Sequence, residues 1–193
     1  MKQQTPVQKV NLKKIYVLGP TGSGKSTLTK KLSKILKITS YDMDDVRFIK
    51  KFTKVRSVVQ RKELVNKILK KEKWIIDARG TDWDRPAMLK ADLIIWLLTP
   101  FYKRVFRVIK RFIQRRNNPA FEEKFIDVFS LIKYTLKFRF GKKATSFKPT
   151  KDFLQKNNLK HIIIKTNFQL TSFLKKIKKN KQQTPKQVFK TAV

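Results

Sequence analysis

The stretch GPTGSGKST, residues 19–27, decides the fold of this chain. Gly19, the four residues after it, Gly24, Lys25 and Ser26 match the pattern G-x-x-x-x-G-K-[ST] at every position. A short β-branched and aromatic run, KIYVL at 14–18, precedes the stretch, and apolar residues at helical spacing follow it. The sequence therefore predicts a strand, a glycine-rich loop and a helix in direct succession.

This loop has the composition of an anion-binding site. Glycine allows the backbone to turn so that successive N–H groups converge, and the start of a helix adds the positive end of its dipole. Lys25 would then reach the terminal phosphates, and the Ser26 hydroxyl would bind Mg²⁺. We therefore expect the loop to hold ATP and Mg²⁺, and the predicted nucleotide-binding residues are Gly19, Thr21, Gly22, Ser23, Gly24, Lys25, Ser26 and Thr27.

Strand and helix patterns alternate along the rest of the chain. Extended segments are predicted at 38–41, at 73–78, within 91–100 and at 160–165, with amphipathic segments between them. One predicted helix carries the apolar set Val55, Val58, Val59, Val65, Ile68 and Leu69, and Asp84 with Pro86 predicts a capped helix start. We therefore expect an α/β, three-layer P-loop NTPase fold with a parallel five-stranded sheet flanked by helices.

The residues after Pro100 predict a helical lid at about 101–145. The apolar stripe of its first helix is predicted to be Phe101, Val105, Ile109 and Phe112. An adjoining face carries Arg104, Arg107, Arg111 and Arg115. A second helix is expected to begin at Pro119 and to end at Gly141. The domain is predicted to cover 13–178, and the ends, 1–12 and 179–193, which share KQQTP, are expected to be flexible tails.

Composition limits the class of protein. The chain has 193 residues, no cysteine, and 48 Lys+Arg against 13 Asp+Glu, which gives a formal net charge of +35. Without cysteine, disulfides and thiolate zinc sites are excluded. No apolar run approaches the ~20 residues of a membrane helix, so we expect a soluble, cytoplasmic protein without a membrane partner. The charge indicates either a polyanionic partner such as nucleic acid or a compositional bias, and both readings stay open.

Charged residues follow the predicted second and third strands, where ligands of open parallel sheets bind. A carboxylate there can bind the metal or accept a proton from an attacking hydroxyl, and an arginine can hold an anionic acceptor. We predict that Asp77 contributes with Ser26 to the metal site. The predicted acceptor-binding residues from these two strand ends are Asp44, Asp45, Asp77 and Arg79. The alternative for each aspartate is a helix cap or a surface charge.

The arginine face of the lid can supply positive charge to a transferring phosphoryl group. Arg107 and Arg111 are the preferred pair, and a solvated basic face is the alternative. The tryptophans are interpreted as packing residues, and they are Trp74, Trp83 and Trp96.

Five segments, KKIYVLGPTGSGKSTLTKKLS, YDMDD, KWIIDARGT, ADLIIWLLTP and RVIKR, resemble the adenylate-kinase-like P-loop group known as DNA topology modulation proteins, within the nucleoside and nucleotide kinase superfamily. The likeness covers about 13–178. It implies an acidic residue after the second strand at Asp44, lid arginines at Arg107 and Arg111, and ATP and Mg²⁺ contacts from Gly22, Gly24, Lys25, Ser26 and Thr27. The chain departs from that pattern at Ala78, where the group usually has glycine, and at Thr99, where it often has an acidic residue.

A second resemblance concerns MDDVR, residues 43–47, which is similar to the D-D-x-R element of polynucleotide 5′-hydroxyl kinases. It implies that Asp44 is the base and that Arg47 binds the phosphate of the acceptor. We expect a kinase that transfers the γ-phosphoryl group of ATP to a small hydroxyl or phosphate acceptor, with Lys25, Asp44, Arg107 and Arg111 as catalytic residues. The alternatives are a polynucleotide 5′-hydroxyl kinase and a nucleic-acid-associated ATP-binding protein without transfer activity.

Overall fold

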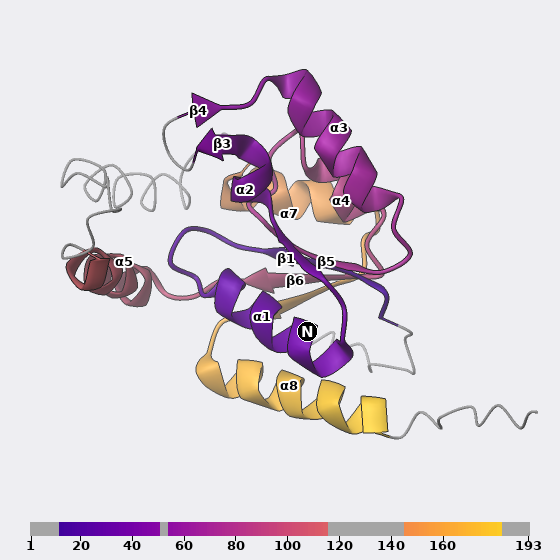
Figure 1. Cartoon of the computed structure of the whole chain (residues 1–193). Coiled ribbons are helices and arrows are strands. Elements are labelled where there is room, and N and C mark those ends of the chain that lie inside the picture. The colour runs from indigo at the N-terminus through magenta and orange to yellow at the C-terminus, as the bar shows by residue number, and fades with distance from the viewer. Residues whose placement is uncertain (1–11, 51–53, 116–144, 183–193) are drawn as a thin grey trace, which may run out of the picture.

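One parallel sheet organises the part of the chain that the computed structural model describes, residues 12–50, 54–115 and 145–182 (Figure 1). Its five strands lie in the order β2-β5-β1-β6-β7. They are β1 (Lys14–Leu18), β2 (Ser40–Asp42), β5 (Trp74–Ala78), β6 (Leu93–Leu97) and β7 (His161–Ile164). All four neighbouring pairs are parallel. The predicted five-stranded parallel sheet is therefore confirmed.

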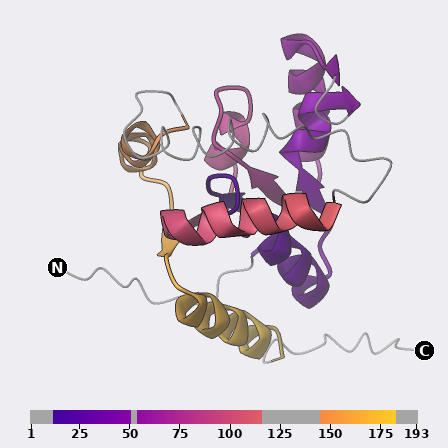
Figure 2. The same ribbon diagram turned by 90° about the vertical axis from the view of Figure 1, so that its left-hand side faces the viewer.

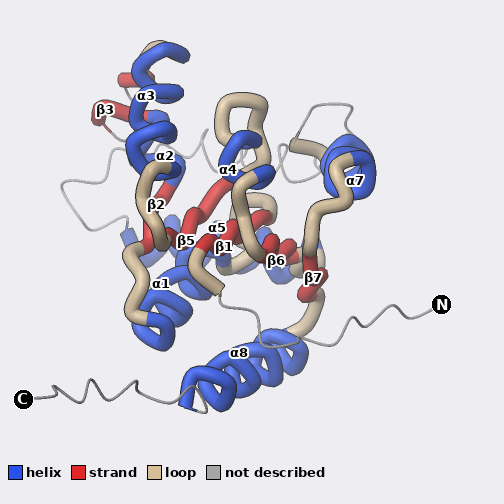
Figure 3. The backbone as a smooth tube through the Cα atoms, turned by 90° about the vertical axis from the view of Figure 1, so that its right-hand side faces the viewer, coloured by secondary structure: helices blue, strands red, loops and turns tan. Residues whose placement is uncertain are grey.

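Helices cover both faces of the sheet, as Figures 1 and 3 show. On one side lie α1 (Lys25–Leu36) and α8 (Asn167–Gln182). On the other side lie α2 (Met43–Arg47), α3 (Val58–Leu69), α4 (Arg85–Leu89) and α7 (Phe147–Lys156). This arrangement confirms the predicted three-layer α/β architecture.

Two apolar clusters fill the space between the layers. Side chains alternate along a strand, so Ile15 and Val17 of β1 join the cluster under α1 and α8, whereas Tyr16 and Leu18 join the one under the other helices. Strands buried on both faces must be apolar throughout, which explains their continuous hydrophobic runs. Trp96 is fully buried and stacks on Phe147 of α7, with ring centroids 5.1 Å apart.

The segment before α3 differs from its prediction. Val55 lies in β4 (Lys54–Val55), which pairs antiparallel with β3 (Phe48–Lys50), so a two-stranded hairpin stands where the beginning of the helix was expected. Ser57 and Gln60 form a capping box that starts α3 at Val58. Val58 and Val59 are exposed, and the buried part of the predicted stripe is Val65, Ile68 and Leu69.

Helix α7 was not predicted, although its start carries a recognisable signal in Ser146 at the N-cap and Pro149 in the first turn. Helix α8 continues to Gln182, beyond the expected domain boundary at residue 178. The second lid helix, expected at 119–141, lies outside the described residues, as do 1–11 and 183–193 of the tails. None of the described helices combines the length and apolar character that crossing a bilayer requires.

Helix α5 (Phe101–Arg115) crosses the end of the sheet, as Figure 2 shows. Arg104 and Val108 are buried, whereas Phe101 and Ile109 of the predicted apolar stripe are exposed. The predicted packing face is therefore wrong, because α5 lies over the phosphate loop and not over an apolar face of the sheet. The side chains of Phe112 and Arg115 lie outside the description.

Candidate functional site

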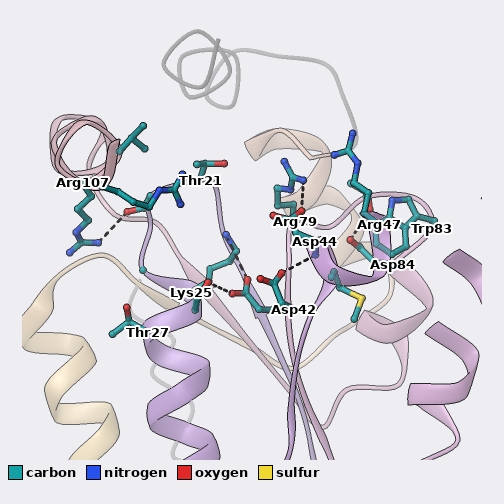
Figure 4. A pocket seen from close by; sticks show the side chains of 18 residues that line it. Thr21, Lys25, Thr27, Asp42, Asp44, Arg47, Arg79, Trp83, Asp84 and Arg107 are labelled. Atoms are coloured by element: carbon teal, nitrogen blue, oxygen red, sulfur yellow. Dashed lines mark hydrogen bonds and ion pairs between the residues drawn. The ribbon is translucent and has the colours of Figure 1, made fainter. Parts of the chain in front are cut away.

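A cleft of about 440 Å³, a size typical of small-molecule sites, opens at the carboxyl ends of β1, β2 and β5 (Figure 4). Sequence-predicted residues that line it are Thr21, Gly22, Gly24, Lys25, Ser26, Thr27, Asp44, Arg47, Asp77, Arg79, Arg107 and Arg111. It is also lined by residues that the sequence did not assign to a site, namely Asp42, Met43, Thr81, Trp83, Asp84 and Val108.

The backbone of the phosphate loop has the conformation that its glycines allow. Gly22 and Gly24 have φ values of 76° and 95°, in the region that residues with a side chain rarely adopt. A Cβ atom at Gly22 would lie 2.7 Å from the carbonyl oxygen of Arg104, so α5 packs directly against the loop. Gly24 is the N-cap of α1, which places the start of that helix at the cleft.

Gly19 and Ser23 were predicted to contact the nucleotide, but they support the loop from behind and do not line the cleft. A Cβ atom at Gly19 would lie 2.8 Å from both the Leu97 carbonyl oxygen and the Ser23 hydroxyl. Ser23 is buried, and its carbonyl accepts hydrogen bonds from the Thr99 hydroxyl at 2.9 Å and from Arg107 at 3.1 Å. Thr99, a departure from the resembled group, therefore ties the loop to the end of β6.

Lys25, Ser26 and Asp77 meet at the floor of the cleft. The Ser26 hydroxyl donates to Asp77 Oδ2 at 2.6 Å, and Lys25 Nζ lies 3.8 Å from Asp77 Oδ1 and donates to the Pro20 carbonyl at 3.2 Å. Burial raises the pKa of Asp77, although Lys25 and Ser26 act in the opposite direction. Burial likewise lowers the pKa of Lys25, against the attraction of Asp77. Each charge therefore partly offsets the desolvation of the other.

Asp42 lies beside Asp77 because β2 pairs with β5 in a register that aligns these two residues. Asp42 is also the N-cap of α2, where its Oδ1 accepts from the Asp44 backbone N–H at 2.8 Å. Burial raises its pKa, and repulsion from Asp77 adds to the effect. Asp42 belongs to the segment YDMDD, but only the strand register shows that it lies beside Asp77.

The oxygen atoms at this floor fit a shared magnesium site. Mg²⁺ is usually held by one or two protein oxygens together with phosphates and water. Ser26 Oγ and Asp77 Oδ2 lie side by side, with Asp42 on the neighbouring strand. Within the described ranges, no group of three or more His, Cys, Asp or Glu side chains could enclose a metal ion. The donors therefore suit an ion that is also bound by a phosphate.

Asp44 and Arg79 form an ion pair on the side of the cleft away from Arg107, with Arg79 NH2 2.6 Å from Asp44 Oδ1 (Figure 4). Arg47, one helical turn beyond Asp44, lines the same end. Asp45 is exposed and does not line the cleft, because adjacent residues of a helix point in different directions. Of the two aspartates at the start of α2, only Asp44 therefore faces the cleft.

The arginine face of α5 lies against the phosphate loop. The guanidinium of Arg107 donates to the carbonyl oxygens of Gly22, at 3.3 Å, and Ser23. Arg111 lines the cleft one turn further along the helix. Arg104 is buried behind them and does not line the cleft. The preferred pair, Arg107 and Arg111, therefore lines the cleft. Because Arg104 is buried, this face of α5 is not purely a solvated basic face.

Trp83 and Asp84 form the far end of the cleft, where the sequence assigned only packing and capping. Asp84 is the N-cap of α4, but its side chain makes no capping bond. Instead, it accepts hydrogen bonds from the hydroxyls of Tyr16, at 2.9 Å, and Thr81, at 2.7 Å. Trp83 packs partly against the apolar cluster and also lines the cleft. No local sequence signal links Tyr16 to Asp84, because they are 68 residues apart.

No protein-family model matches this chain, but its sequence is similar to that of a curated protein. The uncharacterized protein YqaC of Bacillus subtilis (strain 168) is 37% identical over 107 residues. This match covers 55% of the chain and 60% of YqaC, so the chain matches about three fifths of the length of its relative.

Several solved structures are similar across most of their length. They include shikimate kinase from Acinetobacter baumannii in complex with shikimate, with a TM-score of 0.53, 19% identity and coverage of 89% of this chain and 96% of the other. Shikimate kinase from Bacteroides thetaiotaomicron has a TM-score of 0.54 and 16% identity, with coverage of 89% of this chain and 99% of the other. A gluconokinase from Sinorhizobium meliloti 1021 has a TM-score of 0.52 and 11% identity, with coverage of 87% of this chain and 90% of the other. The chain therefore has the α/β fold of the P-loop kinases, whereas membership of the DNA topology modulation group stays a prediction.

Proposed function

We propose that the chain is an ATP-dependent P-loop phosphotransferase that acts on a hydroxyl or phosphate of a small acceptor. The observation that carries this proposal is the composition of a single cleft. Its floor holds the phosphate loop with Lys25, Ser26 and Asp77, and its opposite wall holds the Asp44–Arg79 pair. A phosphate donor site and a site for an attacking group are therefore adjacent, as phosphoryl transfer requires.

The donor side follows from the loop and the floor. Backbone N–H groups of the loop and Lys25 would bind the β- and γ-phosphates, while Ser26 and Asp77 would hold Mg²⁺. When bound, ATP supplies the phosphoryl group and Mg²⁺ neutralises charge on the phosphates. Lys25 Nζ donates to the Pro20 carbonyl and lies 3.8 Å from Asp77 Oδ1, and an ammonium has three N–H donors, so Lys25 can keep these contacts and still donate to a phosphate.

On the acceptor side, Asp44 would accept the proton of the attacking hydroxyl. The acceptor oxygen would form a bond to the γ-phosphorus as the bond to the ADP oxygen breaks, and Asp44 would retain the proton. Arg79 positions Asp44 through their ion pair. Arg107 and Arg111 would stabilise the negative charge of the phosphoryl group, since both line the cleft from α5.

A screen with γ-labelled ATP tests the proposal. Acceptors would include nucleosides, nucleoside monophosphates, shikimate, gluconate and 5′-hydroxyl oligonucleotides, each with Mg²⁺. Lys25→Ala should abolish transfer with the fold retained, because it removes the positive charge that would contact the terminal phosphates of ATP. Lys31→Ala is the matched control, since Lys31 lies exposed on the same helix. Transfer by the Lys25→Ala variant at the rate of the control would contradict the assignment.

A second candidate is a polynucleotide 5′-hydroxyl kinase. It is supported by the presence of Arg47 in the same cleft as Asp44, and by the net charge of +35. On this reading Arg47→Ala lowers transfer to a 5′-hydroxyl oligonucleotide while calorimetric ATP binding stays unchanged. Tight, salt-dependent binding of the oligonucleotide with no transfer to any acceptor would instead support an ATP-binding protein without transfer activity.

A further inference from the structure

The cleft extends beyond the Asp44–Arg79 pair, and the phosphate chemistry proposed above does not use this part. In Figure 4, Trp83 and Asp84 lie next to Arg47, on the side of the cleft away from Arg107. Thr81 completes this end. We call these three residues, Thr81, Trp83 and Asp84, the far subsite. It is aromatic and polar, so it can bind a part of the acceptor that does not react.

Asp84 is a rigid hydrogen-bond acceptor at the base of the far subsite. It is only 1% exposed yet lines the cleft, and each of its oxygen atoms accepts one hydroxyl bond from within the protein. The Tyr16 hydroxyl in turn accepts from the Gly80 N–H at 3.2 Å, which fixes the direction of its own proton. The Thr81 backbone adds a third hydrogen bond to this carboxylate. A carboxylate has about four lone-pair positions, so these bonds leave room for one donor of a ligand.

The ionisation of Asp84 reinforces this role. Burial raises its pKa to about 6, while the hydrogen bonds from Thr81 and Tyr16 and the charge of Arg79 oppose the change. At neutral pH the carboxylate form therefore predominates, and it accepts hydrogen bonds without donating any. A ligand group that meets it must carry a donor, such as an amino group.

Trp83 supplies an aromatic wall beside this acceptor. Its ring is partly buried, and the Arg61 guanidinium lies 5.5 Å from the ring centroid, which restricts its motion. Trp74 and Trp96, in contrast, are fully buried in the apolar clusters. A fixed indole next to an acceptor-only carboxylate matches the surface of a nucleobase, which has an apolar ring face and amino donors at its edge.

The charges at this end favour a neutral acceptor over an anionic one. Arg47 and Arg79 are balanced by Asp44 and Asp84, and Arg79 is already paired with Asp44 at 2.6 Å. A phosphate placed here would compete with Asp44 for Arg79 and meet the buried charge of Asp84. A neutral molecule with hydroxyl and amino donors meets neither obstacle.

We propose that the acceptor is a nucleoside, with a hydroxyl at Asp44, its base against Trp83 and the exocyclic amino group of the base donating to Asp84. This assignment deepens the proposed function and rests on it. It places the residues that select the acceptor in the far subsite, separate from those that bind ATP.

Intrinsic fluorescence tests the proposal, because Trp83 is the tryptophan that a ligand in the cleft can reach. The other two, Trp74 and Trp96, are 0% exposed. The full chain is first saturated with Mg²⁺ and adenylyl imidodiphosphate, an ATP analogue that resists transfer, so that the donor site is filled. Calorimetry of this step reports on the proposed function alone.

Nucleosides are then titrated in pairs that differ only by the amino group, adenosine against purine riboside and cytidine against 2-pyrimidinone riboside. We expect quenching of Trp83, with at least one amino nucleoside binding about tenfold or more tightly than its partner. Equal affinities within both pairs, or quenching by gluconate and by neither amino nucleoside, would overturn the proposal.

Asp84→Asn should reduce the preference within the responding pair to about threefold or less. Asp82→Asn is the matched control, since the side chain of Asp82 is 82% exposed, pairs with Arg85 at 3.3 Å and does not line the cleft. If circular dichroism shows that Asp84→Asn does not fold, the titrations of the nucleoside pairs on the unaltered chain still test the proposal. If the analogue does not bind, the proposed function fails, and the same titrations on the free chain still show whether a nucleoside binds.

Discussion

Replacing Gly22 or Gly24 by alanine separates two costs in the phosphate loop. Both glycines have positive φ, at 76° and 95°, so either substitution forces an L-residue into a conformation that costs about 1–2 kcal/mol. At Gly24 the new Cβ would lie 3.3 Å from the end of the Arg107 side chain, which can move. We therefore expect Gly24→Ala to lower the free energy of unfolding by about 1–2 kcal/mol, from backbone strain alone.

At Gly22 the new Cβ meets backbone atoms. It would lie 2.7 Å from the Arg104 carbonyl oxygen, and ordinary contact begins at 3.4 Å, so loop and helix must separate by about 0.7 Å. Arg107 resists this movement, because its guanidinium joins α5 to the Gly22 and Ser23 carbonyls. Overpacking adds about 1–3 kcal/mol to the strain, so Gly22→Ala should cost about 2–5 kcal/mol in total.

Urea unfolding followed by tryptophan fluorescence measures both costs, and calorimetry with Mg·ATP measures the effect on binding. Gly22→Ala should be the less stable variant and should bind ATP more weakly than Gly24→Ala, because α5 and its arginines shift with the loop. Equal stability of the two variants, or a more stable Gly22→Ala variant, would refute the argument that α5 packs directly on the loop.

Two further predictions concern hydrogen bonds around the cleft. The pKa of Asp84 is raised from its ordinary 3.8 to about 6, so the native state binds this proton more tightly than the unfolded chain does. The associated stability is present below pH 4 and lost as pH rises through 6. Between pH 4 and pH 7 the unfolding free energy of the unaltered chain should therefore fall by about 2 kcal/mol more than that of Asp84→Asn, and parallel pH profiles in urea titrations would contradict this. Thr99→Val removes the 2.9 Å hydrogen bond to the Ser23 carbonyl and should lower the free energy of unfolding in urea by about 1 kcal/mol. Thr99→Ser keeps the hydroxyl donor and should lower it less. A valine variant as stable as the serine variant would show that this hydrogen bond does not support the loop.

Much of the site could be predicted because its signals are local. The phosphate loop is a contiguous stretch, and its glycines, Lys25 and Ser26 are recognisable by spacing alone. Asp44 and Asp77 could be placed at one edge because the strands before them are apolar runs separated by helical patterns, and such strands end at the same edge of a parallel sheet. The alternation of patterns likewise predicted the layers.

The packing direction of α5 could not be predicted in the same way. Its apolar residues suggested a face toward the core, yet Arg104 is buried, and Tyr102 and Phe106 are 66% and 67% exposed. An amphipathic pattern shows that a helix has an apolar and a polar face. It does not predict which face packs against the rest of the protein when the neighbouring element is a phosphate loop. That choice depends on where the chain after Pro100 can run.

The sequence by itself therefore determined the fold class, the phosphate loop and the strand ends that face it, because each rests on residues close together in the chain. The tertiary structure alone decided that Asp42 stands beside Asp77, that Arg107 holds the loop, and that Tyr16 fixes Asp84 at the far subsite. These contacts join residues from 35 to 85 positions apart, through strand order and register. Such partners are set by how the sheet is assembled, and no pattern within one segment encodes that assembly.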